Sequence, residues 1–138
     1  MRARDLESVE ANLQGRRLLI VDEYPITRTV LEIVFGMRGH VCMGVGSADE
    51  ALACIETFEP DVVILEWHFR NGSGRGLGSR LRARALACGR SLVVVVVSVT
   101  DEPPEFRSHD SVDEYLTKPA PAAAIESAFE HHLRKQPT

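Results

Sequence analysis

Acidic, hydroxyl and amine side chains stand at the ends of several apolar runs in this sequence. The five that could carry chemistry are Asp22, Glu23, Glu66, Ser98 and Lys118. Carboxylate oxygens are hard ligands of the kind that Mg²⁺ prefers. The three acids carry three negative charges, and the Lys118 ammonium opposes only one of them. A site for a divalent cation is therefore one chemistry that these residue types could support, if the fold brings them together.

The elements that must position these side chains can be predicted from hydrophobic periodicity. Short apolar runs typical of strands occupy 18–21, 41–45, 62–65, 92–97 and the region of Tyr115 and Leu116. Helix-like patterns separate these runs, which predicts an α/β domain with a five-stranded parallel sheet and right-handed crossovers. The continuous apolar run at 92–97 is typical of a strand that helices cover on both faces.

Local signals mark the helices. Apolar residues recur at helical spacing over 26–37. Ser47 and Glu50 have the spacing of a capping box, in which Glu50 reaches back to the backbone N–H of Ser47. Pro121 opens the last helix, where proline is tolerated. The adjacent Pro103-Pro104 pair cannot lie inside a helix, so we expect the fourth helix, before the fifth strand, to be short or distorted.

The carboxyl ends of parallel strands lie at one edge of an open sheet, and functional groups collect there. With the strand order 2-1-3-4-5, the acids, the hydroxyl and the amine would all converge at that edge. Each of these residues alone would be typical of a solvated turn. It is their joint placement that indicates a functional site.

The residues Asp22-Glu23, Glu66, Ser98 and Lys118-Pro119 together resemble the receiver domain of bacterial two-component response regulators. The resemblance covers about residues 16–135, which divides the chain into an N-terminal extension at 1–15 and a receiver-like domain at 16–138. It implies a flavodoxin-like, doubly wound sheet of order 2-1-3-4-5. It also implies a phosphoacceptor position at Glu66 and an acidic pocket for Mg²⁺ at Asp22, Glu23 and Glu66.

The resemblance assigns further roles around the acceptor position. Ser98 and Tyr115 would form the switch pair, and Lys118 would contact a phosphoryl group. The backbone carbonyl of His68 would be a further metal ligand, whereas its imidazole is a poor substitute acceptor. The Lys118-Pro119 bond would be cis, as X-Pro bonds can be. The implied partners are a histidine kinase, a phosphotransfer protein or a downstream effector protein.

The acceptor position departs from the family pattern because it holds Glu66 rather than aspartate. Phosphorylation is an in-line attack of a carboxylate oxygen on phosphorus. One extra methylene moves that oxygen by roughly 1.5 Å, and a displacement of about 1 Å can cost on the order of 100-fold in rate. We therefore expect a poor acceptor. Its single charge would partly mimic a phosphate of about −1.5 to −2, and we expect Tyr115 to rest inward.

Glu23 also stands where the resemblance places a metal-binding aspartate. Two arrangements stay open at this point. Either Asp22, Glu23 and Glu66 hold Mg²⁺, or the two longer glutamates crowd the pocket and pair with Lys118. Mg²⁺ is the only cofactor that the resemblance implies, and we expect its binding to be weak or absent.

Other motifs are less informative. The glycines within 72–78 could cradle a phosphate, but a flexible connection is the more ordinary interpretation. Thr27 and Thr29 faintly resemble a flavin phosphate loop, although the two acids before them would repel a phosphate. The adjacent His131 and His132 near a helix C-terminus fit an interaction with the helix dipole better than a metal site.

Composition excludes several classes of protein. The chain has 138 residues and a formal net charge of −4, which disfavours nucleic-acid binding by phosphate neutralisation. No segment approaches the roughly 18–20 apolar residues of a membrane span, and residues 1–14 do not resemble a signal peptide. The three cysteines lack metal-type spacing and suit a reducing compartment. We expect a cytoplasmic protein with neither nucleic acid nor membrane as a partner.

The sequence therefore predicts a stand-alone, non-enzymatic and atypical receiver domain in two-component signal transduction. It would act through protein–protein contacts with weak or no phosphorylation. One alternative is a phosphotransfer-competent receiver that accepts a phosphoryl group from a histidine kinase. The other is a flavodoxin-like cofactor-binding protein, which a visible flavin spectrum would reveal.

Overall fold

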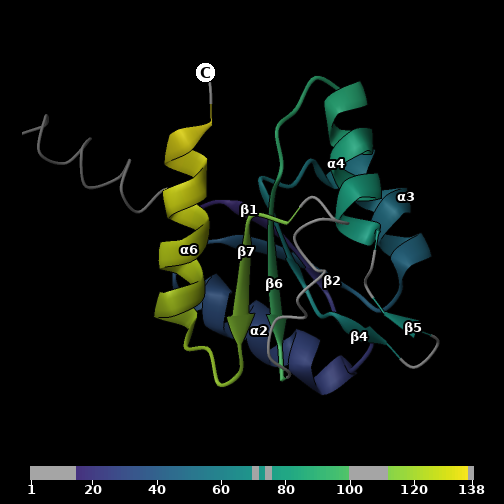
Figure 1. Ribbon diagram of the computed structural model, residues 1–138. Coiled ribbons are helices and arrows are strands. Elements are labelled where there is room, and N and C mark those ends of the chain that lie inside the picture. Colours follow the sequence, from purple (N-terminus) through teal and green to yellow (C-terminus); the bar gives the residue numbers. More distant parts are fainter. Residues whose placement is uncertain (1–14, 70–71, 74–75, 100–111, 137–138) are drawn as a thin grey trace, which may run out of the picture.

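The sheet is parallel and covered by helices on both faces (Figure 1). A computed structural model describes residues 15–69, 72–73, 76–99 and 112–136. The five strands of the main sheet are β1 (Arg17–Val21), β2 (Val41–Val45), β3 (Val62–Leu65), β6 (Val93–Ser98) and β7 (Glu114–Thr117). They run in the order β2-β1-β3-β6-β7, and every neighbouring pair is parallel. This confirms the predicted order 2-1-3-4-5 of a flavodoxin-like fold.

In the described part of the chain, two helices pack on each face of this sheet. The helices are α2 (Pro25–Met37), α3 (Ala48–Phe58), α4 (Leu77–Ala87) and α6 (Ala122–Lys135). Figure 1 shows α2 and α6 on one face and α3 and α4 on the other, in agreement with the two core clusters. The predicted fourth helix falls within residues 100–111, outside the described residues, so its short or distorted form stays a prediction.

The central strands are buried on both faces, which explains their continuous apolar sequences. In β1, Leu18 and Ile20 pack toward Phe35 of α2 and Phe129 of α6. The intervening Leu19 and Val21 pack toward α3 and α4. Each of these strands therefore contributes side chains to both cores. This packing fixes the position of its carboxyl end at the sheet edge.

The start of α3 shows how local sequence sets an element boundary. The Glu50 backbone N–H donates to Ser47 Oγ at 3.2 Å, as the capping box predicts. The Glu50 carboxylate, however, accepts from the backbone N–H of Gly46 at 2.8 Å rather than from that of Ser47. The first bond satisfies a donor in the first turn that has no partner within the helix, and the second holds the residue that leads into the N-cap.

The glycine-rich stretch after β3 is more regular than predicted. Two short strands, β4 (His68–Phe69) and β5 (Gly72–Ser73), form an antiparallel pair. Gly76 then adopts a φ of +79° at the N-cap of α4, a conformation that glycine adopts without strain. Backbone pairing and the start of α4 therefore give the described part of this stretch regular structure, which the sequence did not predict.

Candidate functional site

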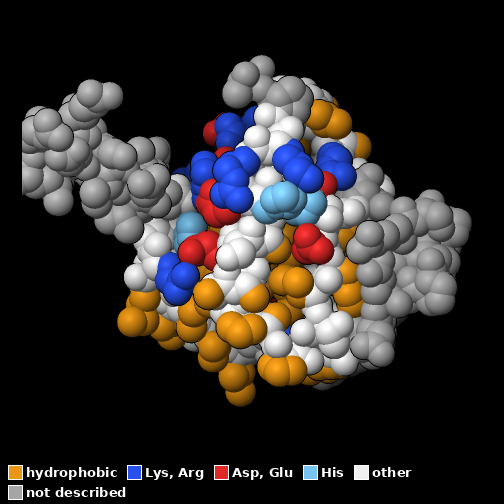
Figure 2. Space-filling view, turned by 60° about the vertical axis from the view of Figure 1, so that its left-hand side comes forward, with side chains coloured by type: hydrophobic (Ala, Val, Ile, Leu, Met, Phe, Trp, Pro, Cys, Tyr) orange, Lys and Arg blue, Asp and Glu red, His pale blue; other side chains and the backbone are white. Residues whose placement is uncertain are grey.

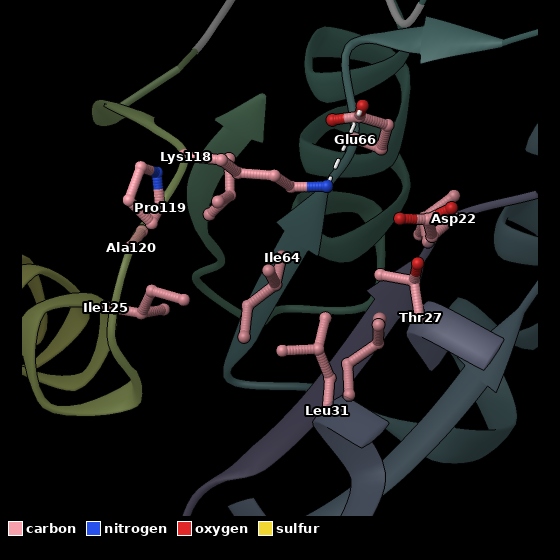
Figure 3. A pocket seen from close by; sticks show the side chains of 12 residues that line it. Asp22, Thr27, Leu31, Ile64, Glu66, Lys118, Pro119, Ala120 and Ile125 are labelled. Carbon is pink, nitrogen blue, oxygen red and sulfur yellow. Dashed lines mark ion pairs between the residues drawn. The ribbon is translucent and has the colours of Figure 1, made fainter. Parts of the chain in front are cut away.

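The carboxyl ends of the central strands surround one cavity of about 290 Å³ (Figure 3). Asp22 follows β1, Glu66 follows β3 and Lys118 follows β7, and all three line this cavity. Its opposite walls are apolar. They include Leu31 of α2, Ile64 of β3, Ala120 just before α6, and Ile125 of α6. The structure thus brings together three of the residues that the sequence predicted at this edge.

Glu66 is buried, with only 8% of its side chain exposed. Its backbone N–H donates to the carbonyl oxygen of Val21 at 2.9 Å, which ties the end of β3 to β1. The Trp67 N–H donates to Glu66 Oε2 at 3.1 Å. The other oxygen, Oε1, lies 3.9 Å from Lys118 Nζ. One oxygen is therefore fixed by the next peptide group, and the second faces an ammonium group.

Asp22 is held by backbone contacts on both sides. Its Oδ1 accepts from the Tyr24 N–H at 2.9 Å, and its own N–H donates to the Val45 carbonyl at 3.1 Å. Arg28 donates through Nη1 to the Asp22 carbonyl oxygen at 2.7 Å. Glu23 is half-buried and is not among the residues that line the cavity. The predicted acidic pair thus contributes one carboxylate to the cavity wall.

The acids do not form a metal site in the part of the chain that the structure describes. There, no group of three or more His, Cys, Asp and Glu residues is placed to hold a metal ion. Of the two arrangements left open by the sequence, the structure shows Glu66 facing Lys118. His68 begins β4 opposite Ser73, and the role of its carbonyl as a metal ligand stays a prediction.

The two residues predicted as a switch pair lie inside the domain. Ser98 at the end of β6 is fully buried, and Tyr115 in β7 is 8% exposed and belongs to the α3–α4 core. The backbone N–H of Lys118 donates to the Ser98 carbonyl at 2.7 Å, so the ends of β6 and β7 are joined. The inward position expected for Tyr115 agrees with this burial. The Lys118-Pro119 bond is cis, as predicted.

Sequence reasoning missed the apolar half of the cavity. Thr27 lines its wall, although the sequence showed only a faint resemblance of Thr27 and Thr29 to a flavin phosphate loop. Thr27 and Leu31 are one helical turn apart on α2, a spacing that places both on one face. Ala120 and Ile125 complete the wall from the α6 side. The helical spacing of Thr27 and Leu31 could have indicated from the sequence that they share one face of α2. No feature of the sequence indicates that Ala120 lines the cavity.

The remaining motifs take structural roles. His132 Nε2 lies 3.1 Å from Glu114 Oε1, and the His131 ring packs edge-on to that of His132. All three cysteines are free. Among the described helices, none is both long and apolar enough to cross a membrane.

Comparison with known proteins agrees with this geometry. The chain is 24% identical over 121 residues to the phosphate regulon transcriptional regulatory protein PhoB of Pseudomonas aeruginosa. The match covers 88% of this chain and 53% of that protein, so the chain spans about half the length of this relative. The CheY-like receiver domain from Methylobacillus flagellatus superposes with a TM-score of 0.73 at 27% identity, covering 86% of this chain and 98% of that one.

A third comparison concerns the fold alone. The receiver domain of the sensor histidine kinase PA1611 from Pseudomonas aeruginosa has a magnesium ion in its active-site cleft. It superposes with a TM-score of 0.69 at 17% identity, over 88% of this chain and 99% of that one.

The family model of the response regulator receiver domain matches residues 18–130, which is most of the chain. The sequence and the fold of this chain thus agree, and the chain belongs to the response regulator receiver domain family.

Proposed function

We propose that this receiver domain acts in two-component signal transduction as an atypical, stand-alone and non-enzymatic module with weak or no phosphorylation. The observation that supports the proposal is the position of Glu66, whose Oε1 lies 3.9 Å from Lys118 Nζ. The glutamate places its own negative charge beside the lysine that would otherwise contact a phosphoryl group. Its partners would be a histidine kinase, a phosphotransfer protein or a downstream effector protein.

The geometry of Glu66 opposes phosphoryl transfer. An acyl phosphate forms when a carboxylate oxygen attacks phosphorus in line with the leaving group, so the position of that oxygen determines the rate. Glu66 carries its carboxylate roughly 1.5 Å further from the backbone than aspartate would. Its Oε2 already accepts a bond from the Trp67 N–H. Attack would therefore fall to Oε1, and the extra methylene displaces that oxygen from the position of an aspartate oxygen.

The acids that the structure describes are not grouped so as to hold a metal ion. Asp22 and Glu66 line the cavity, but Glu23 does not. Lys118 Nζ lies 3.9 Å from Glu66 Oε1. Weak or absent binding of Mg²⁺ is therefore part of the proposal.

The proposal also concerns the state of the switch residues. A single charge at Glu66 would partly replace a phosphate, which carries about −1.5 to −2. The burial of Ser98 and Tyr115 supports a resting state in which Tyr115 lies inward without phosphorylation. Output would then depend on contact with a partner rather than on phosphoryl transfer.

Intact-mass measurement after incubation with acetyl phosphate and Mg²⁺ tests the proposal. We expect no modification of the wild-type protein and the addition of one phosphoryl group to Glu66→Asp, because the shorter side chain moves the oxygen back. Glu66→Gln is the control, since it lacks an acceptor carboxylate. Rapid, stoichiometric addition at Glu66 of the wild type would contradict the proposal and support the phosphotransfer-competent alternative.

The stand-alone and cytoplasmic character of the protein needs a separate test. An antibody against this chain should detect a band near its 15.3 kDa mass in the soluble fraction of the native cell. A larger band would show that the domain works as part of a longer protein. Recovery in the membrane fraction would contradict the expected location.

A further inference from the structure

Helix α2 presents an apolar face to solvent. Four large hydrophobic side chains on it are 51–84% exposed, and they form what we call the α2 stripe: Ile26, Val30, Ile33 and Met37. Their spacing places them along one side of the helix. Figure 2 shows hydrophobic side chains gathered in the lower part of the molecule, where Figure 1 places α2, while most charged side chains lie above them.

The charged side chains of α2 lie away from this stripe. Arg28 donates to the Asp22 carbonyl, and Glu32 lies beside Gly44 of β2. Both are half-buried against the body of the domain. The α2 stripe therefore has no charge of its own, so two copies of it could meet without like-charge repulsion.

The spacing along the stripe is the same in both directions. Its steps are four, three and four residues, which is the a and d spacing of a coiled-coil seam. If a second α2 lies antiparallel to the first, Val30 faces the partner's Ile33 and Ile26 faces the partner's Met37. Every member of the stripe then meets one member of the other stripe. Such self-complementarity is what a two-fold symmetric contact requires.

The two ends of α2 differ in charge, which favours the antiparallel arrangement. Glu23 precedes the Tyr24 N-cap, and Arg38 follows Met37. Arg38 contacts Glu126, but 39% of its side chain stays exposed. The helix dipole adds partial positive charge at the N-terminus and partial negative charge at the C-terminus. An antiparallel pair brings opposite ends together in both respects, whereas a parallel pair would bring like ends together.

Thr29 and Gly36 flank the stripe on one side, and both are exposed. A Cβ built on Gly36 would meet nothing within 4 Å. Glycine weakens a helix relative to alanine, and packing among the described residues gives no reason for it here. In the antiparallel pair Gly36 lies near the partner's Thr29. The absence of a side chain at Gly36 would let the two helices approach closely at that point.

The area of the stripe indicates how strong this contact can be. Full burial of an Ile, Val or Met side chain removes roughly 60–120 Å² from water. The exposed fractions therefore give on the order of 250 Å² of apolar surface per copy. At an apolar share of about 65%, two copies would bury on the order of 800 Å² in total. Contacts of this size lie at the lower limit of specific interfaces, which indicates a reversible dimer.

We propose that the α2 stripe is the contact surface of a reversible, two-fold symmetric dimer of this chain, in which two α2 helices pack antiparallel. Thr27 and Leu31 line the cavity from another side of α2. The dimer contact is therefore distinct from the site of Glu66, and the proposal does not depend on whether Glu66 is phosphorylated.

Disulfide trapping tests the orientation of the two helices. The background is the full chain with Cys42→Ala, Cys54→Ala and Cys88→Ala, and Ile26→Cys and Met37→Cys are added to it separately. Two copies of the same variant would place their thiols roughly 16 Å apart along the helix axes, beyond the Cα separation of about 7 Å that a disulfide spans. We expect neither variant alone to cross-link under mild oxidation, and a mixture of the two to give a cross-linked dimer.

Leu86→Cys on α4 is the matched control, because Leu86 is 62% exposed. Mixed with either α2 variant, it should give only the background cross-linking of random collision. A mixture of Ile26→Cys and Met37→Cys that cross-links no more than this control would overturn the proposal. Efficient cross-linking of Ile26→Cys alone would also overturn it, because that result requires parallel helices.

Size-exclusion chromatography with light scattering tests association of the unmodified chain. We expect the average mass to rise above 15.3 kDa as the protein concentration increases. Ile33→Asp places a charge in the middle of the stripe and should raise the dissociation constant about tenfold or more, whereas Leu86→Asp should leave it unchanged. A mass that stays at 15.3 kDa at every concentration would contradict the proposal, and so would association that Ile33→Asp does not weaken.

Gly36→Gln separates loss of the contact from loss of the fold. Glutamine is a better helix former than glycine, and the added side chain has open space within the domain. We expect the urea midpoint of unfolding to rise while the dissociation constant increases about tenfold. A Gly36→Gln variant that associates as tightly as the wild type would contradict the close approach of the two helices.

Discussion

Lys118 Nζ lies 3.9 Å from Glu66 Oε1, and this ion pair joins the ends of β7 and β3 across the cavity. Lys118 is 30% exposed, whereas Glu66 is 8% exposed. The distance is too long for a strong hydrogen bond, and solvent screens the lysine. The pair therefore acts mainly by placing a positive charge beside a buried negative one.

A double-mutant cycle on this pair should show a modest favourable coupling. We expect Lys118→Met to destabilise the wild type more than it destabilises Glu66→Gln, by about 0.5–1 kcal/mol, because the lysine is partly exposed. The free energy of unfolding in urea measures the difference. Lys135→Met, at the exposed end of α6, is the control and should give no coupling. Equal effects of Lys118→Met in both backgrounds would show that the pair is not an interacting unit.

The cavity itself should be open to filling. Ala120 lines it together with Ile64 and Ile125, so Ala120→Leu would bury added methylene groups against apolar walls. We expect the free energy of unfolding to rise by about 1 kcal/mol, as is common for cavity-filling substitutions. Ala123→Leu, on the exposed side of α6, should change it little. A fall in the urea midpoint of Ala120→Leu would mean that the space is too small or differently shaped.

Glu126 links stability to acidic pH. Arg38 Nη2 lies 2.9 Å from Glu126 Oε1, and the bond from Arg38, together with His40, lowers the pKa of Glu126 to about 2. A carboxylate with a lowered pKa stabilises the fold fully above its unfolded pKa. That contribution disappears as the pH falls from about 4.5 to about 2. We expect Glu126→Gln to lose stability at pH 7 and to show a flatter decline over this range.

Thermal unfolding followed between pH 2 and pH 7 checks this dependence on Glu126. Glu56→Gln is the control, because Glu56 is exposed on α3. A decline in Glu126→Gln as steep as that of the wild type would assign the acid sensitivity to other carboxylates.

The main sheet could be predicted because its central strands are buried on both faces. Val62–Leu65 and the valines at 93–97 read as continuous apolar runs, and the residues after such runs lie at the sheet edge. This is why the sequence could place Glu66 and Ser98 at that edge. The pair of short strands β4 and β5 was missed because two-residue strands carry no periodic signal.

Two features could not be predicted from periodicity, namely the two apolar faces of α2 and the cavity. The apolar residues within 26–37 look like one stripe in the sequence, but they face in two directions. Phe35 is fully buried against the sheet, whereas Ile33 and Met37 face solvent. A sequence pattern identifies the helix without showing which apolar face is covered. The cavity was equally hidden, because it is a gap left between side chains of separate elements.

Fluorine NMR of the protein labelled with 3-fluorotyrosine tests the central claim most directly, namely that Glu66 holds Tyr115 inward without phosphorylation. The chain has two tyrosines, so the 52% exposed Tyr24 is an internal control for the 8% exposed Tyr115. Tyr24→Phe assigns the signals. We predict that the Tyr115 signal has a small solvent isotope shift and does not change with acetyl phosphate and Mg²⁺. In Glu66→Gln it should move toward the exposed behaviour of Tyr24. A wild-type Tyr115 signal that is as solvent-accessible as that of Tyr24, or that moves when the phosphodonor is added, would contradict the account.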